Sequence, residues 1–274
     1  MAKKIRMYLS YIIFFIGIFI LGGTCSYLYK YYSDIHKSKE TFDEVKTLID
    51  EDNKETTYII NMGKKIKVSK RDYTKLYEQN NDFIGWIKIN GTNIDYPVML
   101  TPNNEEYYLH TNFNKQYDFS GVPFCNKEAD LITPSDNITI YGHHMMSGTM
   151  FAQLDKFKQK DFYDEHPTFT FDTIYRWGIY EVVGVYLTDV NEGSYKYWEV
   201  TDCTENEFND YVQFIKNKSL YETNGIENVK YGDKLVSLST CAYHVTNGRL
   251  VVVGKLIYNE PTKLYNSLNL NKNN

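Results

Sequence analysis

The sequence has few cysteines, no excess of positive charge and no internal repeat. Its cysteines, at positions 25, 125, 203 and 241, are widely spaced and form no CxxC pair. The spacing recommends neither a disulfide framework nor a metal site shared with the histidines, so we expect no metal and no cofactor. A formal net charge of −5 and an isoelectric point near 5.7 argue against a nucleic-acid-binding surface.

One long apolar run stands near the start of the chain. Residues 7–29 carry no charge, and about 20 apolar residues suffice to cross the hydrocarbon layer. Three basic side chains within residues 1–6 precede the run, so the positive-inside rule predicts a cytoplasmic N-terminus and an extracellular chain after Lys30. A cleaved signal peptide is the alternative, but no A-x-A-like site follows the run. We predict an uncleaved single-pass anchor in the cell membrane.

Residues 30–80 are rich in Lys, Glu, Asp and Tyr and predict an N-terminal helical segment. Thr41 and Glu44 fit a capping box at the start of one helix. Four apolar side chains then fall on one face of this helix, namely Phe42, Val45, Leu48 and Ile49. Residues 69–77 predict a second short helix. We expect both helices to pack against the main domain and to separate it from the membrane.

From residue 81 the apolar period becomes that of strands. Short β-branched and aromatic runs are separated by Gly, Asn, Asp and Pro. These runs are 83–89, 94–100, 138–141, 168–171, 180–187, 234–239 and 250–257. Without regularly alternating helices they favour a barrel or a sandwich, so residues 81–260 predict a mainly β domain followed by a flexible tail over 261–274.

One longer helix interrupts the strands. Thr204 and Glu207 fit a capping box at its start. Its buried stripe is expected to consist of Phe208, Tyr211, Val212 and Ile215.

Three strand ends carry side chains with useful chemistry. An apolar run that alternates with period two ends in Cys241, and after a polar bend the next run opens with Arg249. A third run ends in glycine followed by His143. Most free cysteines are inert core residues, so a reactive one needs a partner such as an imidazole. A thiol, an imidazole and a guanidinium together predict one catalytic site.

The motifs Tyr-Gly-His, Met-Phe-x-x-Leu and Leu-Ser-Thr-Cys end at His143, Leu154 and Cys241, and Arg249 follows the cysteine by eight residues. This set resembles the class B sortases, membrane-anchored cysteine transpeptidases of Gram-positive cell walls. The likeness covers most of residues 70–258. It implies a closed β-barrel with flanking N-terminal helices and one long helix inserted before the cysteine strand.

The resemblance also implies a reaction. Cys241 would attack a peptide carbonyl and form a thioacyl intermediate, and His143 would protonate the leaving amine and later deprotonate the incoming one. Arg249 cannot usefully lose its proton, so it would donate to the substrate backbone or to the developing oxyanion. The substrates would be secreted proteins with a C-terminal sorting motif of the Asn-Pro-x-Thr-Asn or Pro-x-Thr-Gly type, cut after Thr. The acceptor would be an amine of peptidoglycan or its precursor.

Ser239 is a further candidate, for substrate binding. Strand alternation puts its side chain on the same side as that of Cys241. Its hydroxyl either contacts the sorting motif or is paired within the barrel, as buried hydroxyls commonly are.

Three other histidines are expected outside the catalytic set. In extended backbone His144 points away from His143, and His110 and His244 are read as surface or locally hydrogen-bonded side chains. Four apolar residues after the histidines fall at helical spacing and are expected to pack, namely Met150, Phe151, Leu154 and Phe157.

One local signal opposes a shared site. The Asn-Gly dipeptide at 247–248 favours a two-residue turn that pairs Thr246 with Arg249. Cys241 would then lie five residues back, roughly 16 Å away at about 3.3 Å per residue. We therefore predict an open loop over 242–248.

Two other functions fit the same features. A membrane-tethered cysteine endopeptidase would use the same Cys and His but transfer the acyl group to water. A non-catalytic extracellular β-domain that binds wall components would also explain the anchor and the many tyrosines.

Overall fold

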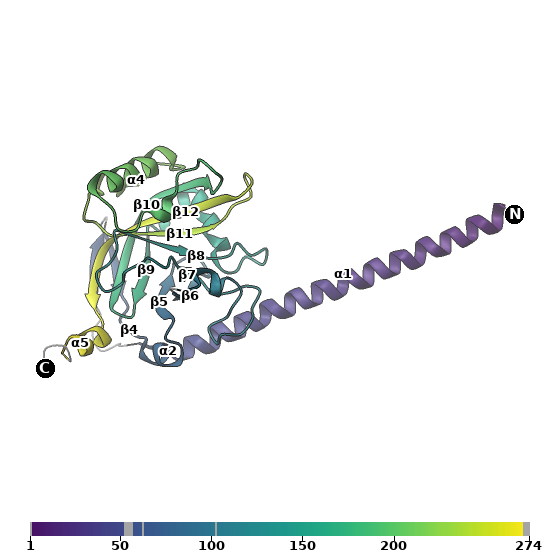
Figure 1. The fold of residues 1–274 in the computed structure, drawn as a ribbon, viewed down its shortest axis with the longest axis horizontal. Coiled ribbons are helices and arrows are strands. Elements are labelled where there is room, and N and C mark those ends of the chain that lie inside the picture. The colour runs from purple at the N-terminus through teal and green to yellow at the C-terminus, as the bar shows by residue number, and fades with distance from the viewer. Residues whose placement is uncertain (1, 52–56, 62, 102, 271–274) are drawn as a thin grey trace.

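A long helix and a closed β-barrel dominate the computed structural model, which describes residues 2–51, 57–61, 63–101 and 103–270 (Figure 1). Helix α1 (Ala2–Thr47) is the one helix in these ranges that is long and apolar enough to cross a membrane. Its unbroken course shows that the predicted helix start at Thr41 is wrong, because the Thr41 hydroxyl donates to the Lys37 carbonyl one turn earlier. Phe42 and Val45 are buried against the barrel, as predicted.

Eight strands close the barrel in the order β10-β12-β11-β8-β7-β6-β5-β9, which confirms the predicted fold class. Their bounds are β5 (Phe83–Lys88), β6 (Asp95–Met99), β7 (Phe124–Cys125), β8 (Asn137–Tyr141), β9 (Thr168–Thr173), β10 (Arg176–Asp189), β11 (Leu235–Cys241) and β12 (Gly248–Pro261). Neighbours are antiparallel except for the parallel pairs β8–β11 and β6–β7. The sequence signalled every strand of the barrel but β7, which has only two residues.

The segment between α1 and the barrel is less helical than predicted. It contains β1 (Asp50–Glu51) paired with β4 (Arg71–Asp72), β2 (Thr57–Asn61) paired with β3 (Lys64–Val68), and the short helix α2 (Thr74–Gln79). The predicted helix over 69–77 begins only at Thr74, where the Asp72 carboxylate accepts hydrogen bonds from the backbone N–H and the hydroxyl of Thr74.

The remaining helices are short, apart from one. They are η1 (Glu105–Leu109), η2 (Phe151–Lys158), α3 (Lys160–Glu165), η3 (Tyr197–Glu199), α4 (Glu205–Lys218), η4 (Ile226–Asn228) and α5 (Lys263–Leu270). Helix α5 occupies most of the tail that was expected to be flexible, and residues 271–274 lie outside the described ranges.

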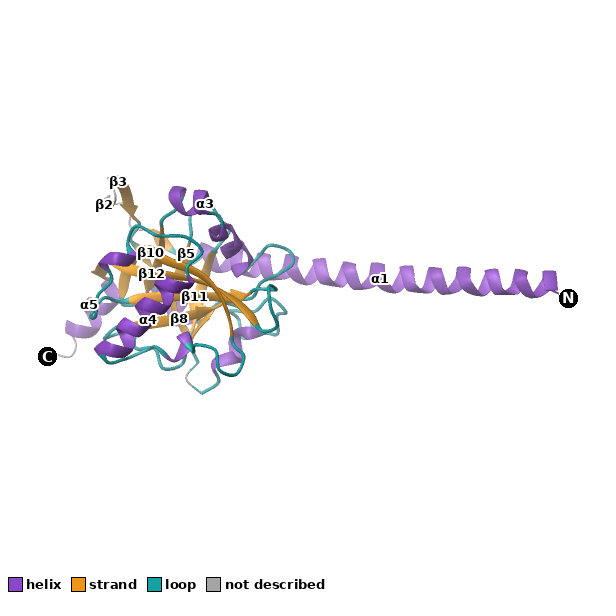
Figure 2. Cartoon of the chain, turned by 90° about the horizontal axis from the view of Figure 1, so that it is seen from above, coloured by secondary structure: helices purple, strands orange, loops and turns teal. Residues whose placement is uncertain are grey.

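Helix α4 covers the outer face of β10, β11 and β12 (Figure 2). Its capping box between Thr204 and Glu207 is present, and its four predicted stripe residues are buried. Strand alternation divides β11 between two cores. Val236 and Leu238 face the barrel interior, whereas Leu235 packs with α4 outside the barrel. The other residues at odd positions of β11, including Cys241, therefore face the side that α4 covers.

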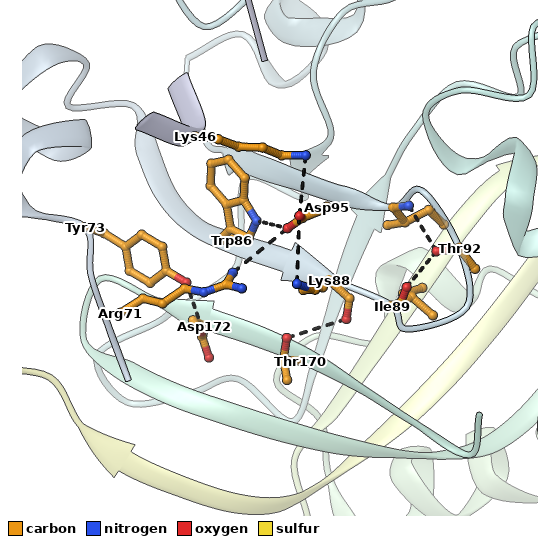
Figure 3. A network of polar contacts seen from close by, with 11 residues as sticks. Lys46, Arg71, Tyr73, Trp86, Lys88, Ile89, Thr92, Asp95, Thr170 and Asp172 are labelled. Carbon is orange, nitrogen blue, oxygen red and sulfur yellow. Dashed lines mark hydrogen bonds and ion pairs between the residues drawn. The ribbon is translucent and has the colours of Figure 1, made fainter. Parts of the chain in front are cut away.

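The end of α1 is fastened to the barrel wall by polar contacts around Asp95 (Figure 3). The Asp95 carboxylate lies 3.4 Å from the Lys46 ammonium and accepts a 2.7 Å hydrogen bond from the Trp86 indole. Further up the helix, the Ser38 hydroxyl donates to the buried Asp118 carboxylate at 2.6 and 2.7 Å. The contacts of Lys46 and Ser38, together with the buried side chains of Phe42 and Val45, join α1 to the barrel.

Candidate active site

Cys241 and Arg249 are direct neighbours across two antiparallel strands. Cys241 ends β11, and its Cα partner on β12 is Arg249. Side chains opposed in this way have Cβ atoms about 4.5–5.5 Å apart and share one face of the sheet. Residues 242–248 form a wide loop between them, as predicted. A 2.9 Å hydrogen bond from the Ala242 N–H to the Gly248 carbonyl joins the two sides of this loop at its base. The tight Asn-Gly turn is therefore not formed.

His143 reaches the same edge from the other side of β11. Strand β8 runs parallel to β11, and the pairing continues past its last residue. The Gly142 N–H donates to the Ser239 carbonyl, and the Thr240 hydroxyl donates to the Gly142 carbonyl. One residue further along each strand, His143 comes level with Cys241. The chain thus brings together the three residues that the sequence singled out.

The His143 ring is held in one orientation. Its Nε2 lies 2.9 Å from the Leu109 carbonyl, and because a carbonyl only accepts, Nε2 carries the proton. In the neutral ring, Nδ1 then has the free lone pair. Burial lowers the pKa of His143, the Leu109 carbonyl opposes this change, and the nearby charge of His110 lowers the pKa further.

His110 is the neighbour that sequence reasoning missed. It is exposed, and its Nδ1 lies 3.4 Å from the Phe119 carbonyl, as expected for a locally bonded side chain. However, its ring also stacks on His143 with 5.3 Å between centroids. The two residues are far apart in the sequence, and no local pattern links them. The only sign was that His110 lies within the aromatic stretch Tyr107–Phe113.

The Arg249 guanidinium is anchored at the mouth of the loop. Its Nη1 donates to the carbonyls of Gly248 at 3.0 Å and Asn247 at 3.3 Å. The side chain is partly exposed, and no hydrogen bond from Nε or Nη2 is formed within the described ranges. These two nitrogens keep donors for a ligand.

Ser239 is engaged inside the protein. It is 2% exposed, and its hydroxyl lies 2.7 Å from that of Tyr197 in η3. Burial raises the pKa of Tyr197, and the Ser239 hydroxyl and the nearby charge of Arg249 oppose this change. Of the two roles considered for Ser239, contact with a substrate or pairing inside the protein, the structure shows the pairing inside the protein.

The remaining candidates lie outside this arrangement. The His144 Nε2 is 3.1 Å from the Asp155 carboxylate, so its ring points away from His143, as predicted. His244 is exposed in the β11–β12 loop. The four predicted packing residues after the histidines are all buried. No three His, Cys, Asp or Glu side chains come together as metal ligands in the ranges that the structure describes.

Cys241 differs from the two other cysteines of the barrel domain. Burial raises the pKa of Cys125 far above its usual range and that of Cys203 to about 12. Both thiols therefore stay protonated at neutral pH. Cys241 is partly exposed and stands at a strand end beside an imidazole and a guanidinium.

An open groove of about 530 Å³ lies at the end of β8, where Tyr141, two residues before His143, is part of its lining. Tyr141, the register partner of Ser239, lines it together with Trp198, the neighbour of Tyr197. The rest of the lining consists of Glu105, Asn126, Lys127, Glu128, Glu199, Thr201 and Asp202. Carboxylates outnumber ammonium groups in this groove, which makes it acidic.

Comparison with known proteins gives a consistent result. Residues 87–257 match the sortase domain family. Sortase B of Listeria monocytogenes is 31% identical over 261 residues, covering 93% of this chain and 99% of the relative. Sortase B of Staphylococcus aureus is 33% identical over 190 residues, covering 68% and 74%. The crystal structure of sortase B from B. anthracis superposes with a TM-score of 0.65 at 26% identity, covering 82% of this chain and 98% of that one.

Proposed function

Since this chain belongs to the sortase family and to its class B, whose members are cysteine transpeptidases, we propose that Cys241 is its nucleophile, His143 its acid and base, and Arg249 its oxyanion donor. The observation that carries the proposal is the meeting of three strand ends, those of β8, β11 and β12, at one edge of the barrel. Family membership sets aside the non-catalytic wall-binding domain.

In the first half-reaction, the Cys241 Sγ attacks the carbonyl carbon of the threonine in the sorting motif. The thiol proton passes to Nδ1 of His143. This nitrogen is the acceptor because Nε2 already carries a proton, which it donates to the Leu109 carbonyl. The C–N bond then breaks as Nδ1 returns the proton to the leaving amine. The products are a thioester on Cys241 and a free C-terminal fragment.

In the second half-reaction, an amine of peptidoglycan or its precursor attacks the thioester. Nδ1 of His143 takes the proton from this amine, a C–N bond forms and the C–S bond breaks, and Nδ1 then returns the proton to Sγ, which regenerates the thiol. A lowered pKa suits this step, because it keeps the His143 ring neutral and able to accept a proton near neutral pH.

The role of Arg249 follows from its fixed charge. Both tetrahedral intermediates carry a negative oxygen, and a guanidinium beside Cys241 stabilises it electrostatically. Nη1 of Arg249 donates to the carbonyls of Gly248 and Asn247, which positions the side chain. Nε and Nη2 can then donate to the negative oxygen. Preorganised donors of this kind are worth about 3–4 kcal/mol of transition-state stabilisation.

We assign the sorting motif to the groove at Tyr141, the last residue of β8. A Pro-x-Thr segment of the Asn-Pro-x-Thr-Asn or Pro-x-Thr-Gly type would lie there with its threonine at Cys241. The carboxylates of the groove favour a basic side chain at position x. Exposed ion pairs contribute about 0.2–1 kcal/mol, which corresponds to a preference of up to about fivefold for Lys over Gln.

The apolar part of α1 is the proposed membrane anchor, with residues 1–6 in the cytoplasm and the barrel outside the cell. The absence of charge over residues 7–29 and the basic residues before them support this orientation. The enzyme would then meet secreted proteins and the wall amine on the outer face of the membrane.

The test uses the full chain in detergent with quenched peptides that contain Asn-Pro-Gln-Thr-Asn, Ser-Pro-Lys-Thr-Gly or its Gln and Glu variants, with and without a diaminopimelate-type amine. We expect cleavage after Thr, an amide product when amine is present, and rates in the order Lys, Gln, Glu at position x. The variants Cys241→Ala, His143→Ala and Arg249→Ala should lose this activity, whereas Cys203→Ala, which removes a thiol outside the site, should keep it.

Each result has a separate meaning. Free acid as the only product, even with amine present, would identify an endopeptidase that transfers to water. Activity that survives Cys241→Ala would contradict the assignment of the nucleophile. Equal rates for Lys and Glu at position x would contradict the proposal that the motif binds in the acidic groove, and would leave the assignment of the three catalytic residues intact.

A further inference from the structure

Helix α1 joins the barrel at the point where its apolar run ends. The run stops at Lys30, and the ring of the next residue, Tyr31, already contacts the ring of Phe119 at 6.2 Å between centroids. Because an α-helix rises about 1.5 Å per residue, the end of the apolar run at Lys30 and the first contact with the barrel domain at Tyr31 lie at almost the same height along α1. Two turns later, Ser38 is bonded to Asp118 in the same loop. No flexible spacer separates the apolar run from the domain, because α1 is continuous.

The end of the run also has the composition of a membrane interface. Four tyrosines occur within six residues, namely Tyr27, Tyr29, Tyr31 and Tyr32. Tyrosine is enriched where the hydrocarbon layer of a membrane meets the lipid headgroups. The side chains of Tyr27, Tyr29 and Tyr32 are exposed and can take this position. With this belt at the headgroup level, Phe119 lies at that level too.

Three loops form one surface beside the belt. They span residues 110–120, 143–150 and 242–248, and we call them the distal loops. Ring contacts connect them, since His110 stacks on both Phe119 and His143. His144 contacts Tyr243 in the third loop at 5.5 Å. Figures 1 and 2 show that the β11–β12 loop projects to the same side of the barrel as the free part of α1.

The exposed tips of the distal loops are apolar or aromatic. Tyr117 is 80% exposed, Met146 93% and Tyr243 79%, and Phe119 and Val245 are exposed as well. Charged residues make up 24% of the chain, yet these loops contain no Lys, Arg, Asp or Glu apart from Lys115 and Asp118.

The few charges in the loops do not oppose contact with lipid. Asp118 is buried by its bonds to Ser38, and Lys115 is paired with Asp82. An exposed apolar surface of this kind marks an interaction site rather than an ordinary solvated face.

We propose that the distal loops rest on the outer surface of the bilayer that α1 enters, with Tyr117, Met146 and Tyr243 in the headgroup region. This inference rests on the proposed anchoring through α1. The Lys46–Asp95 ion pair and the Ser38–Asp118 hydrogen bonds hold the barrel domain against α1, so an inserted α1 brings the loops down to the membrane (Figure 3). The catalytic strand ends then face the lipid surface.

The experiment reconstitutes the full chain in vesicles of phosphatidylcholine and phosphatidylglycerol, with bromine near the headgroup end of the acyl chains as a fluorescence quencher. Tyr117→Trp introduces a reporter at the loop tip. Tyr231→Trp is the matched control, because Tyr231 is also partly exposed but precedes β11, at the end of that strand opposite to Cys241. The parent chain, with Trp86, Trp177 and Trp198, gives the background.

We expect the added emission of Tyr117→Trp to shift to the blue and to be lost in brominated vesicles, and that of Tyr231→Trp to change in neither way. Equal behaviour of the two reporters, in a chain that floats with the vesicles, would overturn the inference and leave the anchor intact. A blue shift of Tyr117→Trp without quenching would also overturn it, since it would indicate a contact between two copies of the chain. A chain that does not float would refute both the anchor and the docking, whereas peptide cleavage reports separately on the catalytic proposal.

Discussion

The variant Gly248→Ala tests whether the β11–β12 loop holds Cys241 and Arg249 in register. A Cβ atom on Gly248 would lie 2.2 Å from the Ala242 carbonyl oxygen and 2.9 Å from the His244 ring. Real Cβ contacts essentially never fall below 3.0 Å, and the Ala242 oxygen is backbone that cannot rotate away. The two sides of the loop must therefore separate by about 1 Å, and this motion displaces the adjoining strand ends.

The expected losses differ for activity and for stability. A misplacement of about 1 Å in a catalytic arrangement can cost on the order of 10²-fold in rate, or about 2.7 kcal/mol in transition-state free energy. Overpacking of this kind costs typically 1–3 kcal/mol of unfolding free energy, which is less than the 5–15 kcal/mol of a typical domain. We therefore expect a folded protein with kcat/KM reduced about 100-fold.

Peptide cleavage and thermal unfolding, measured on the same preparations, separate these two effects. Gly232→Ala is the matched control, since Gly232 precedes β11 at the far end of the strand and has a φ of +95° but no atom within 4 Å of an added Cβ. Its backbone strain should cost about 1–2 kcal/mol of stability and leave kcat/KM unchanged. If Gly248→Ala kept the kcat/KM of the parent chain, the loop would not be what aligns the thiol and the guanidinium.

Two further predictions concern titration. His110→Phe keeps an aromatic ring against His143 but removes a charge that lowers the pKa of His143, so the acid limb of the pH–rate profile should move to higher pH, and an unmoved limb would contradict the electrostatic role of the stack. Burial raises the pKa of Asp172 from 3.8 to about 6, although the Tyr73 hydroxyl and the Arg71 charge oppose the change. The folded state therefore binds this proton more tightly than the unfolded state, and the resulting stability is fully present below about pH 4 and lost as the pH rises through about 6. Asp172→Asn should remove this part of the pH dependence of urea unfolding, and an unchanged slope would assign it to other groups.

The sequence predicted those parts of the fold that have a clear period or a strong terminal signal. The strands that carry Cys241 and Arg249 and the strand before His143 have five residues or more, and their apolar residues either alternate with polar ones or follow one another directly. The capping box of α4 is complete. Strand β7 has two residues, too few for any period, and its place is set by its neighbours β6 and β8. Neither Gly nor Pro occurs from residue 24 to residue 61, so nothing local ends α1. Thr41 and Glu44 have the spacing of a capping box, but the Thr41 hydroxyl bonds instead to the carbonyl four residues earlier, as a threonine inside a helix can.

The direction of one strand decides whether this barrel can hold a catalytic site at all. Because β8 runs parallel to β11, both strands end at the same edge, where His143 follows one and Cys241 ends the other. Because β12 runs antiparallel, it starts where β11 ends, and so Arg249 stands opposite Cys241. If β8 paired with the same residues in the opposite direction, Tyr141 would lie beside Leu235, about 20 Å from Cys241 at 3.3 Å per residue, and His143 would lie farther away still. No motif in the sequence states this direction. It follows from the connection between β8 and β11, which passes through β9, β10 and α4 before the chain returns beside β8.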